Sequence, residues 1–122
     1  MKKFTDSHEW IDLQGSGGIA TVGVTDHAQQ ELGDIVFVEL PKVGKEIGAG
    51  QPAAVLESTK AAADVYAPVA GTVVEINHAL SEQSDLINKA AEREGWIFKL
   101  KVNDPSDMEK LMDESAYLAS LK

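Results

Sequence analysis

Residues 57–71 read Glu-Ser-Thr-Lys-Ala-Ala-Ala-Asp-Val-Tyr-Ala-Pro-Val-Ala-Gly. Two β-prone runs, Pro52–Leu56 and Asp64–Tyr66, flank the lysine in this stretch, Lys60, and the residues nearest to it are small. The pattern predicts a hairpin with Lys60 standing clear at its tip. A lysine presented in this way is accessible to another enzyme and can root a covalently attached group. Taken by itself, however, most lysines are ordinary solvated side chains.

The composition is that of a globular protein with an acidic surface. The 122 residues are enough for one domain with its own core, and the hydrophobic content is 43%. The net charge is −9, from 20 acidic and 11 basic residues. Nucleic acid and anionic membranes are therefore unsuitable partners, because they are bound by clustered lysine and arginine. The acidic surface suits solubility alone as well as encounters with basic proteins.

No residue pattern for a self-contained active site or a metal site is present. The chain has no cysteine, which excludes disulfides, thiolate zinc sites and a cysteine nucleophile. The histidines, His8, His27 and His78, lack the spacing and neighbouring ligands of a zinc site. No nucleophile elbow, P-loop or dinucleotide-binding motif can be found.

No segment has the character of a membrane span or a targeting signal. No run of residues approaches 18 apolar positions, and Met1–Asp6 contains neither an apolar signal region nor an Arg/Ser-rich amphipathic stretch. We therefore expect a soluble, cytoplasmic protein.

Short strands separated by glycine-rich turns dominate the chain up to residue 102. Besides the two runs beside Lys60, strands are expected at His8–Leu13, Ile19–Val24, Ile35–Leu40 (mostly buried), Val73–Ile76 and, with alternating burial, 96–102. A short helix is expected over Thr25–Leu32, with Asp26 as its N-cap and Gly33 at its end. A helical turn is expected over Ser84–Asn88. Because no βαβ alternation occurs, antiparallel sheets in a sandwich or flattened barrel are favoured.

A helical segment is expected at the C-terminal end of the chain, over about residues 105–122. The Ser-Asp-Met-Glu sequence at 106–109 has the pattern of a capping box, and apolar residues follow at helical spacing. Residues 113–115 are expected to interrupt this helix. The predicted organisation is one domain over residues 1–122, with its core at about 19–102.

The region around Lys60 resembles the biotinyl/lipoyl carrier fold. Residues 43–50 match Val-Gly-x-x-Ile-x-x-Gly, and residues 67–71 match Ala-Pro-x-x-Gly. Biotin carriers usually have methionine on both sides of the lysine, whereas this chain has threonine and alanine there, so lipoate is the expected group. Glu57 and Gly71 occupy positions that resemble the marks read by lipoylating enzymes.

Nearly the whole chain is similar to the H protein of the glycine cleavage system. The matching segments are residues 7–10, 22–29, 32–41, 57–61 and 95–96. A plain lipoyl domain would lack the Ser-His-Glu-Trp start and the C-terminal helix. The resemblance implies a mainly β fold with short helices, a biotinyl/lipoyl-type flattened barrel or sandwich (hammerhead) with a C-terminal helix. One departure is Ala91-Glu92, where the family often has Pro-Tyr.

The resemblance implies a carrier that is not itself an enzyme. Lys60 would bear (R)-lipoate in amide linkage, attached by a lipoate ligase or a lipoyl/octanoyl transferase. The arm would shuttle the aminomethyl group of glycine between a pyridoxal-phosphate glycine decarboxylase, a tetrahydrofolate-dependent aminomethyltransferase and a flavin dihydrolipoamide dehydrogenase. By family position, Ser7, Glu9 and Asp64 would line the cleft for the loaded arm, and His27 would contact the arm.

Other interpretations of the same residues stay open. A protein of this type can instead relay lipoate to the carrier domains of other enzymes, or serve unmodified as a binding or scaffold protein. Ser7 and Glu9 also fit an exposed strand start, Asp64 a solvated hairpin charge, and His27 a polar helix residue. An independent enzyme has the least support, because no site for it is visible.

Overall fold

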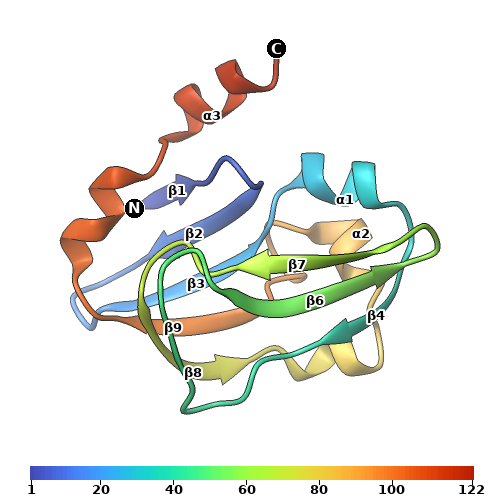
Figure 1. Cartoon of the computed structure of the whole chain (residues 1–122), viewed down its shortest axis with the longest axis horizontal. Helices are drawn as coiled ribbons and strands as arrows, with labels where there is room; N and C mark the ends of the chain where they lie inside the picture. Colours follow the sequence, from blue (N-terminus) through green and yellow to red (C-terminus); the bar gives the residue numbers. More distant parts are fainter.

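The computed structural model describes all residues, 1–122, and consists of two antiparallel sheets with short helices at their margins (Figure 1). The larger sheet has the strand order β1-β2-β3-β9-β8-β5, and the smaller sheet has the order β4-β6-β7. The strands are β1 (Lys2–Phe4), β2 (Glu9–Leu13), β3 (Ile19–Val24), β4 (Ile35–Glu39), β5 (Glu46–Ile47), β6 (Pro52–Ser58), β7 (Ala62–Tyr66), β8 (Gly71–Ile76) and β9 (Phe98–Val102).

The helical segments are all short. They are α1 (Asp26–Leu32), α2 (Leu86–Ala90) and α3 (Glu114–Ser120), with two 3₁₀ segments, η1 (His78–Ser81) and η2 (Pro105–Lys110). None of them is long and apolar enough to cross a membrane. In Figure 1, α3 lies beyond β1 at the N-terminal edge of the larger sheet, and α1 stands near the turn between β6 and β7.

The core lies between the two sheets, because each sheet contributes one apolar face. Ile11, Val22 and Phe98 come from the larger sheet, and Leu56 and Val65 come from the smaller one. All five are almost fully buried. Neither sheet closes on itself, so the mainly β prediction is confirmed in its sandwich form.

The structure corrects the predicted start of α1. Thr25 is the N-cap: it has an extended backbone, and its hydroxyl oxygen accepts a hydrogen bond from Ala28 N at 3.2 Å. Asp26 is already helical, and its carboxylate accepts hydrogen bonds from the side chains of Gln29 and Gln30 instead. The end of the helix at Gly33 is as predicted, with a positive φ of 83°.

Two strands are less regular than the sequence pattern predicts. β4 is not mostly buried, because Val36 and Phe37 are exposed where the register with β6 shifts. β9 begins only at Phe98, and the preceding Ile97 is fully buried while Trp96 is half-buried. The strict alternation expected from residue 96 is therefore wrong at the start of this strand.

The C-terminal segment contains two short helical pieces and not one interrupted helix. η2 is a 3₁₀ segment whose N-cap is Asp104, to which both the backbone N–H and the hydroxyl of Ser106 donate. The chain then extends, and Met112 pairs with Phe4 in an isolated bridge. Asp113 caps α3 through Ala116 N at 2.8 Å. Residues 113–115 therefore start a helix, where an interruption was predicted.

Candidate functional site

Lys60 lies exposed at the tip of the β6–β7 hairpin. The strands pair as far as Glu57 opposite Ala62, which leaves residues 58–61 as the turn. Ser58 shapes this turn, since its hydroxyl oxygen accepts hydrogen bonds from Lys60 N and Ala61 N, each at 3.1 Å. The turn holds the lysine without using its side chain.

The hairpin tip packs against the end of α1. Thr59 N donates to the carbonyl oxygen of Asp34 at 3.1 Å. A Cβ added to Gly33 would lie 3.4 Å from Lys60 Cε. The aliphatic stem of the lysine therefore runs across Gly33, where any larger residue would crowd it.

A cleft of about 160 Å³ opens between α1, β7 and the segment before β2. We call it the α1 cleft. Its walls are mostly apolar, and its lining residues are Ser7, His8, Glu9, Val24, Ala28, Glu31, Leu32, Leu56, Ala63, Asp64 and Val65. Three residues expected from the sequence, Ser7, Glu9 and Asp64, thus meet in one cavity. Leu32 adjoins Gly33, so one wall of the cleft lies next to the residue that the Lys60 stem crosses.

Glu9 is a buried carboxylate, with only 2% of its surface exposed. The hydroxyls of Thr5 and Ser7 donate to its Oε1 at 2.6 Å each, and the backbone N–H of Tyr66 donates to Oε2 at 3.3 Å. Burial raises the pKa of the Glu9 carboxyl, and these hydrogen bonds oppose the rise. An arriving cation would offset the cost of the buried charge. The alternative interpretation of Glu9 as part of an exposed strand start is therefore wrong.

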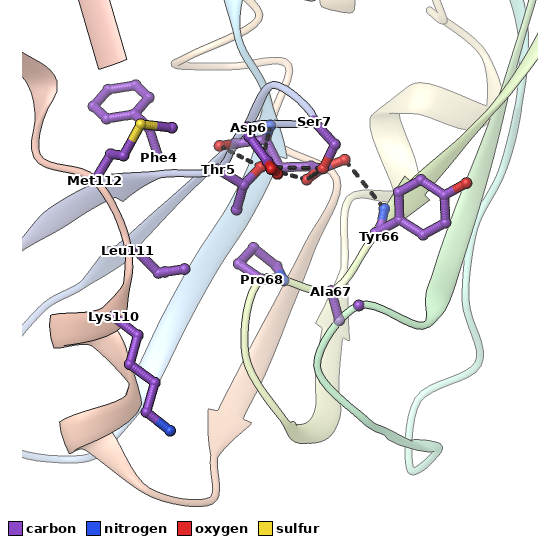
Figure 2. A pocket seen from close by; sticks show the side chains of 12 residues that line it. Phe4, Thr5, Asp6, Ser7, Tyr66, Ala67, Pro68, Lys110, Leu111 and Met112 are labelled. Atoms are coloured by element: carbon purple, nitrogen blue, oxygen red, sulfur yellow. Dashed lines mark hydrogen bonds between the residues drawn. The ribbon is translucent and has the colours of Figure 1, made fainter. Parts of the chain in front are cut away.

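A second cavity, of about 410 Å³, also has Glu9 among its lining residues (Figure 2). It shares Ser7 and Glu9 with the α1 cleft. In Figure 2, Tyr66, Ala67 and Pro68 form one side and Lys110, Leu111 and Met112 form the other. The Glu9 side chain thus borders two hollows of the surface.

His27 is not among the residues that line the α1 cleft, but it contacts two of them. Its Nε2 lies 2.6 Å from Glu31 Oε1, and its ring centroid lies 4.7 Å from that of His8. The His8 ring in turn contacts Tyr117 of α3. No cluster of three or more histidine, aspartate or glutamate side chains in the structure could hold a metal ion.

Four polar residues of this site escaped prediction from the sequence: Thr5, His8, Glu31 and Tyr117. Thr5 and His8 lie beside predicted residues, and His8 belongs to the Ser-His-Glu-Trp segment, so a signal for it existed. Tyr117 gave no signal, because it lies 109 positions from His8 in the chain.

The two residues expected to guide lipoylation lie in different places. Glu57 is exposed on β6, between Phe37 and Ala62 in the sheet. Gly71 begins β8, far from the β6–β7 turn in Figure 1, and a Cβ there would lie 2.6 Å from the carbonyl oxygen of Lys101. Glycine at 71 is therefore required by close strand packing. Its recognition by an enzyme stays a prediction.

Ala91 and Glu92, where the chain departs from the family pattern, both contact the sheet. Ala91 is buried, and its carbonyl oxygen accepts a hydrogen bond from Trp10 Nε1 at 3.0 Å. Glu92 forms an ion pair with Lys2, with Nζ to Oε1 at 3.0 Å. The loop is thus fixed to β1 and β2.

Comparison with known proteins assigns the chain to a family. The family model described as "Glycine cleavage H-protein" matches residues 2–122. A glycine cleavage system H protein of Thermotoga maritima is 51% identical over 96% of this chain and 93% of its own, and one of Parvibaculum lavamentivorans is 53% identical over 94% and 90%. The crystal structure of a glycine cleavage system H protein from Mycobacterium marinum superposes with a TM-score of 0.90, at 33% identity over 98% of this chain and 95% of that one. The exposed hairpin lysine beside its cleft is thus found in a chain that belongs to the glycine cleavage H-protein family, whose members are non-catalytic lipoyl carriers of the glycine cleavage system.

Proposed function

We propose that Lys60 bears lipoate in amide linkage, and that this arm carries the aminomethyl group of glycine. It would take the group from a pyridoxal-phosphate glycine decarboxylase to a tetrahydrofolate-dependent aminomethyltransferase, and a dihydrolipoamide dehydrogenase would reoxidise it. One observation carries the proposal: an exposed lysine at a hairpin tip lies against Gly33, and the adjoining Leu32 lines a cleft that contains the buried Glu9.

The residues around Lys60 fit a lipoyl group. The arm reaches about 14 Å from the lysine Cα at ordinary bond lengths. Acylation removes the charge of the amine, so the arm can lie on the apolar wall that Leu32, Leu56 and Ala63 provide. When bound, lipoate supplies a disulfide that accepts the aminomethyl group on one sulfur.

The polar residues of the α1 cleft suit a cationic cargo. The aminomethyl group carries an ammonium, which the Glu9 carboxylate would accept in a charge-assisted hydrogen bond. Ser7 already donates to Glu9 and holds the carboxylate in place. Asp64 adds negative charge at the cleft, and His27 supports the wall through its contact with His8. These residues would keep water from the cargo between partner enzymes.

Tethering the aminomethyl group also raises its concentration near the partner enzymes. A group confined within the reach of a short arm has an effective concentration in the millimolar range or above near a docked enzyme. The net charge of −9 favours partners with basic docking surfaces.

The proposed unit is a single lipoyl-carrier domain over residues 1–122. Its arm would be attached by a lipoate ligase or a lipoyl/octanoyl transferase, which would read Glu57 near the tip. Recognition of Gly71 by such an enzyme stays a prediction, beside the strand packing that this glycine permits.

Mass spectrometry of the native protein tests this proposal. We expect one lipoyl increment on the intact protein, placed on Lys60 by peptide mapping and absent from Lys60→Arg. Lys89→Arg is the matched control and should be modified like the wild type. Lipoate on Lys42, Lys45 or Lys89 would contradict the assignment. The modified protein should also restore glycine cleavage when it is added to the other three components.

A further inference from the structure

Three consecutive residues, Ser7, His8 and Glu9, all line the α1 cleft. An extended chain cannot achieve this, because successive side chains of a strand point to opposite sides. The chain is kinked at His8, which has a φ of 70° and is the only non-glycine residue with a positive φ. The left-handed conformation of His8 therefore brings its own ring to the cavity that Ser7 and Glu9 line.

A left-handed residue with a side chain is strained, so other contacts must hold it. The carbonyl oxygen of His8 accepts a hydrogen bond from Thr25 N at 3.0 Å. Its ring Nδ1 lies 2.8 Å from the Tyr117 hydroxyl, and that hydroxyl lies 2.7 Å from Thr25 Oγ1. Tyr117 thus joins the His8 ring to the residue that holds the His8 backbone.

The Tyr117 ring attaches α3 to the sheet through apolar contacts that do not involve its hydroxyl. The ring stacks on Phe4 at 4.8 Å between centroids with an interplanar angle of 10°. Met112 and Leu121 pack against the same cluster. Only 3% of Tyr117 is exposed, and the two hydrogen bonds of its hydroxyl satisfy a buried polar group. The apolar ring anchors the helix, and the hydroxyl faces the cleft segment.

We propose that Tyr117 is a positioning residue of the α1 cleft, which acts through the His8 ring to keep Ser7 and Glu9 directed at the cargo. α3 would then be part of the carrier site, although it lies outside both sheets. Because the His8 ring contacts His27, Tyr117 would also position the His27 ring through His8. This inference rests on the proposed function of the cleft.

The first test uses the unmodified protein. Tyr117→Phe keeps the stacking on Phe4 and removes only the hydroxyl. We expect shifted imidazole nitrogen resonances of His8 and faster exchange of the Thr25 amide proton. Leu121→Ala is the matched control, since it weakens the packing of α3 without touching this hydrogen-bonded chain. It should leave both signals unchanged.

The second test measures the lifetime of the cargo as the release of ammonia and formaldehyde in the absence of folate. Tyr117→Phe should speed this release about two- to tenfold, the loss expected for one net hydrogen bond. The rate of lipoylation should not change, because Lys60 is untouched. His8→Gly keeps a positive φ accessible and lacks the ring. In the His8→Gly background, Tyr117→Phe should therefore add nothing.

The outcomes distinguish a failure of the proposed function of the cleft from a failure of the proposed role of Tyr117. If the wild type releases its cargo as fast as free aminomethylated lipoamide, the proposed function of the cleft fails. If the wild type protects its cargo and Tyr117→Phe does so equally, the role of Tyr117 alone is overturned. An equal effect of Leu121→Ala, or an undiminished effect of Tyr117→Phe without the His8 ring, would also overturn it.

Discussion

The Glu92 carboxylate accepts a hydrogen bond from the backbone N–H of Asp26 at 3.0 Å. Asp26 is the first residue of α1, so this N–H has no partner within the helix. The same carboxylate forms an ion pair with Lys2 through its other oxygen. The departure from the family pattern at position 92 thus ties the start of α1 to β1.

Replacing Glu92 should lower the free energy of unfolding and leave the β6–β7 hairpin intact. Glu92→Ala removes a helix-terminal hydrogen bond and a half-buried ion pair, and we expect about 0.5–1.5 kcal/mol less free energy of unfolding. Urea denaturation measures this difference. Glu94→Ala, at an exposed neighbouring position, is the control and should change the value by less than about 0.5 kcal/mol. Equal losses in the two variants would show that the contact with Asp26 contributes nothing.

Replacing Glu9 should shorten the lifetime of the cargo without affecting lipoylation. A charge-assisted hydrogen bond in a partly shielded cleft is worth about 1.5–3 kcal/mol, so Glu9→Ala should speed the release of ammonia and formaldehyde about ten- to a hundredfold. His27→Ala should act in the same direction but less strongly. Asp6→Ala is the matched control, because Asp6 is exposed and belongs only to the second cavity. A Glu9→Ala lifetime equal to that of the wild type would remove Glu9 from the site.

The pH dependence of stability should carry a signature of Glu9. Burial raises the pKa of this carboxyl in the folded protein above about 4.3, its value in an unfolded chain. Its contribution to stability is then complete below about pH 4.3 and is lost as the pH rises through the folded pKa. Glu9→Gln abolishes this titration. The free energy of unfolding of Glu9→Gln minus that of the wild type should therefore increase with pH and then level off. Urea titrations of both proteins from about pH 4 to about pH 7 test this expectation, and a difference that falls with pH would contradict it.

Recognition by the lipoylating enzyme should depend on Glu57 more than on other acids of the same sheet face. Glu57→Gln keeps the shape of the side chain and removes its charge, so we expect kcat/KM for lipoylation to fall roughly tenfold, the cost of one hydrogen bond to a charged group. Glu39→Gln is the matched control, since Glu39 is likewise exposed and lies on neighbouring β4. Equal rates for both variants and the wild type would assign no role to Glu57.

The hairpin and most strands could be predicted because their signals are local. Lys60 lies between two short runs that pair with each other, and the β2–β3 hairpin follows from alternating residues around glycines. The cap of α1 was placed one residue late because Thr25 and Asp26 have equal capping chemistry, and only the extended backbone of Thr25 decides between them.

The arrangement of the site could be predicted only in part. Ser7, Glu9 and Asp64 were expected from family position, and the structure brings them to one cleft. Thr5 lies near Glu9 in the chain, but nothing local reveals the contact with Tyr66, which lies 57 positions from Glu9. The contact of Tyr117 with His8 depends on where α3 packs, which no residue pattern near either position encodes.

The hydrogen bonds of Ser58 in the β6–β7 turn have a consequence for the rate at which the arm is attached. The turn is ordered in the unmodified protein by Ser58 together with the contact between Thr59 N and Asp34 O. An enzyme that binds a flexible loop must order it at a cost in conformational entropy, whereas this tip is already ordered. The modifying enzyme would then distinguish Lys60 from the other lysines by the folded shape around it, so an unfolded chain would be a poor substrate. Lipoylation would thereby mark only those copies of the protein that have completed folding.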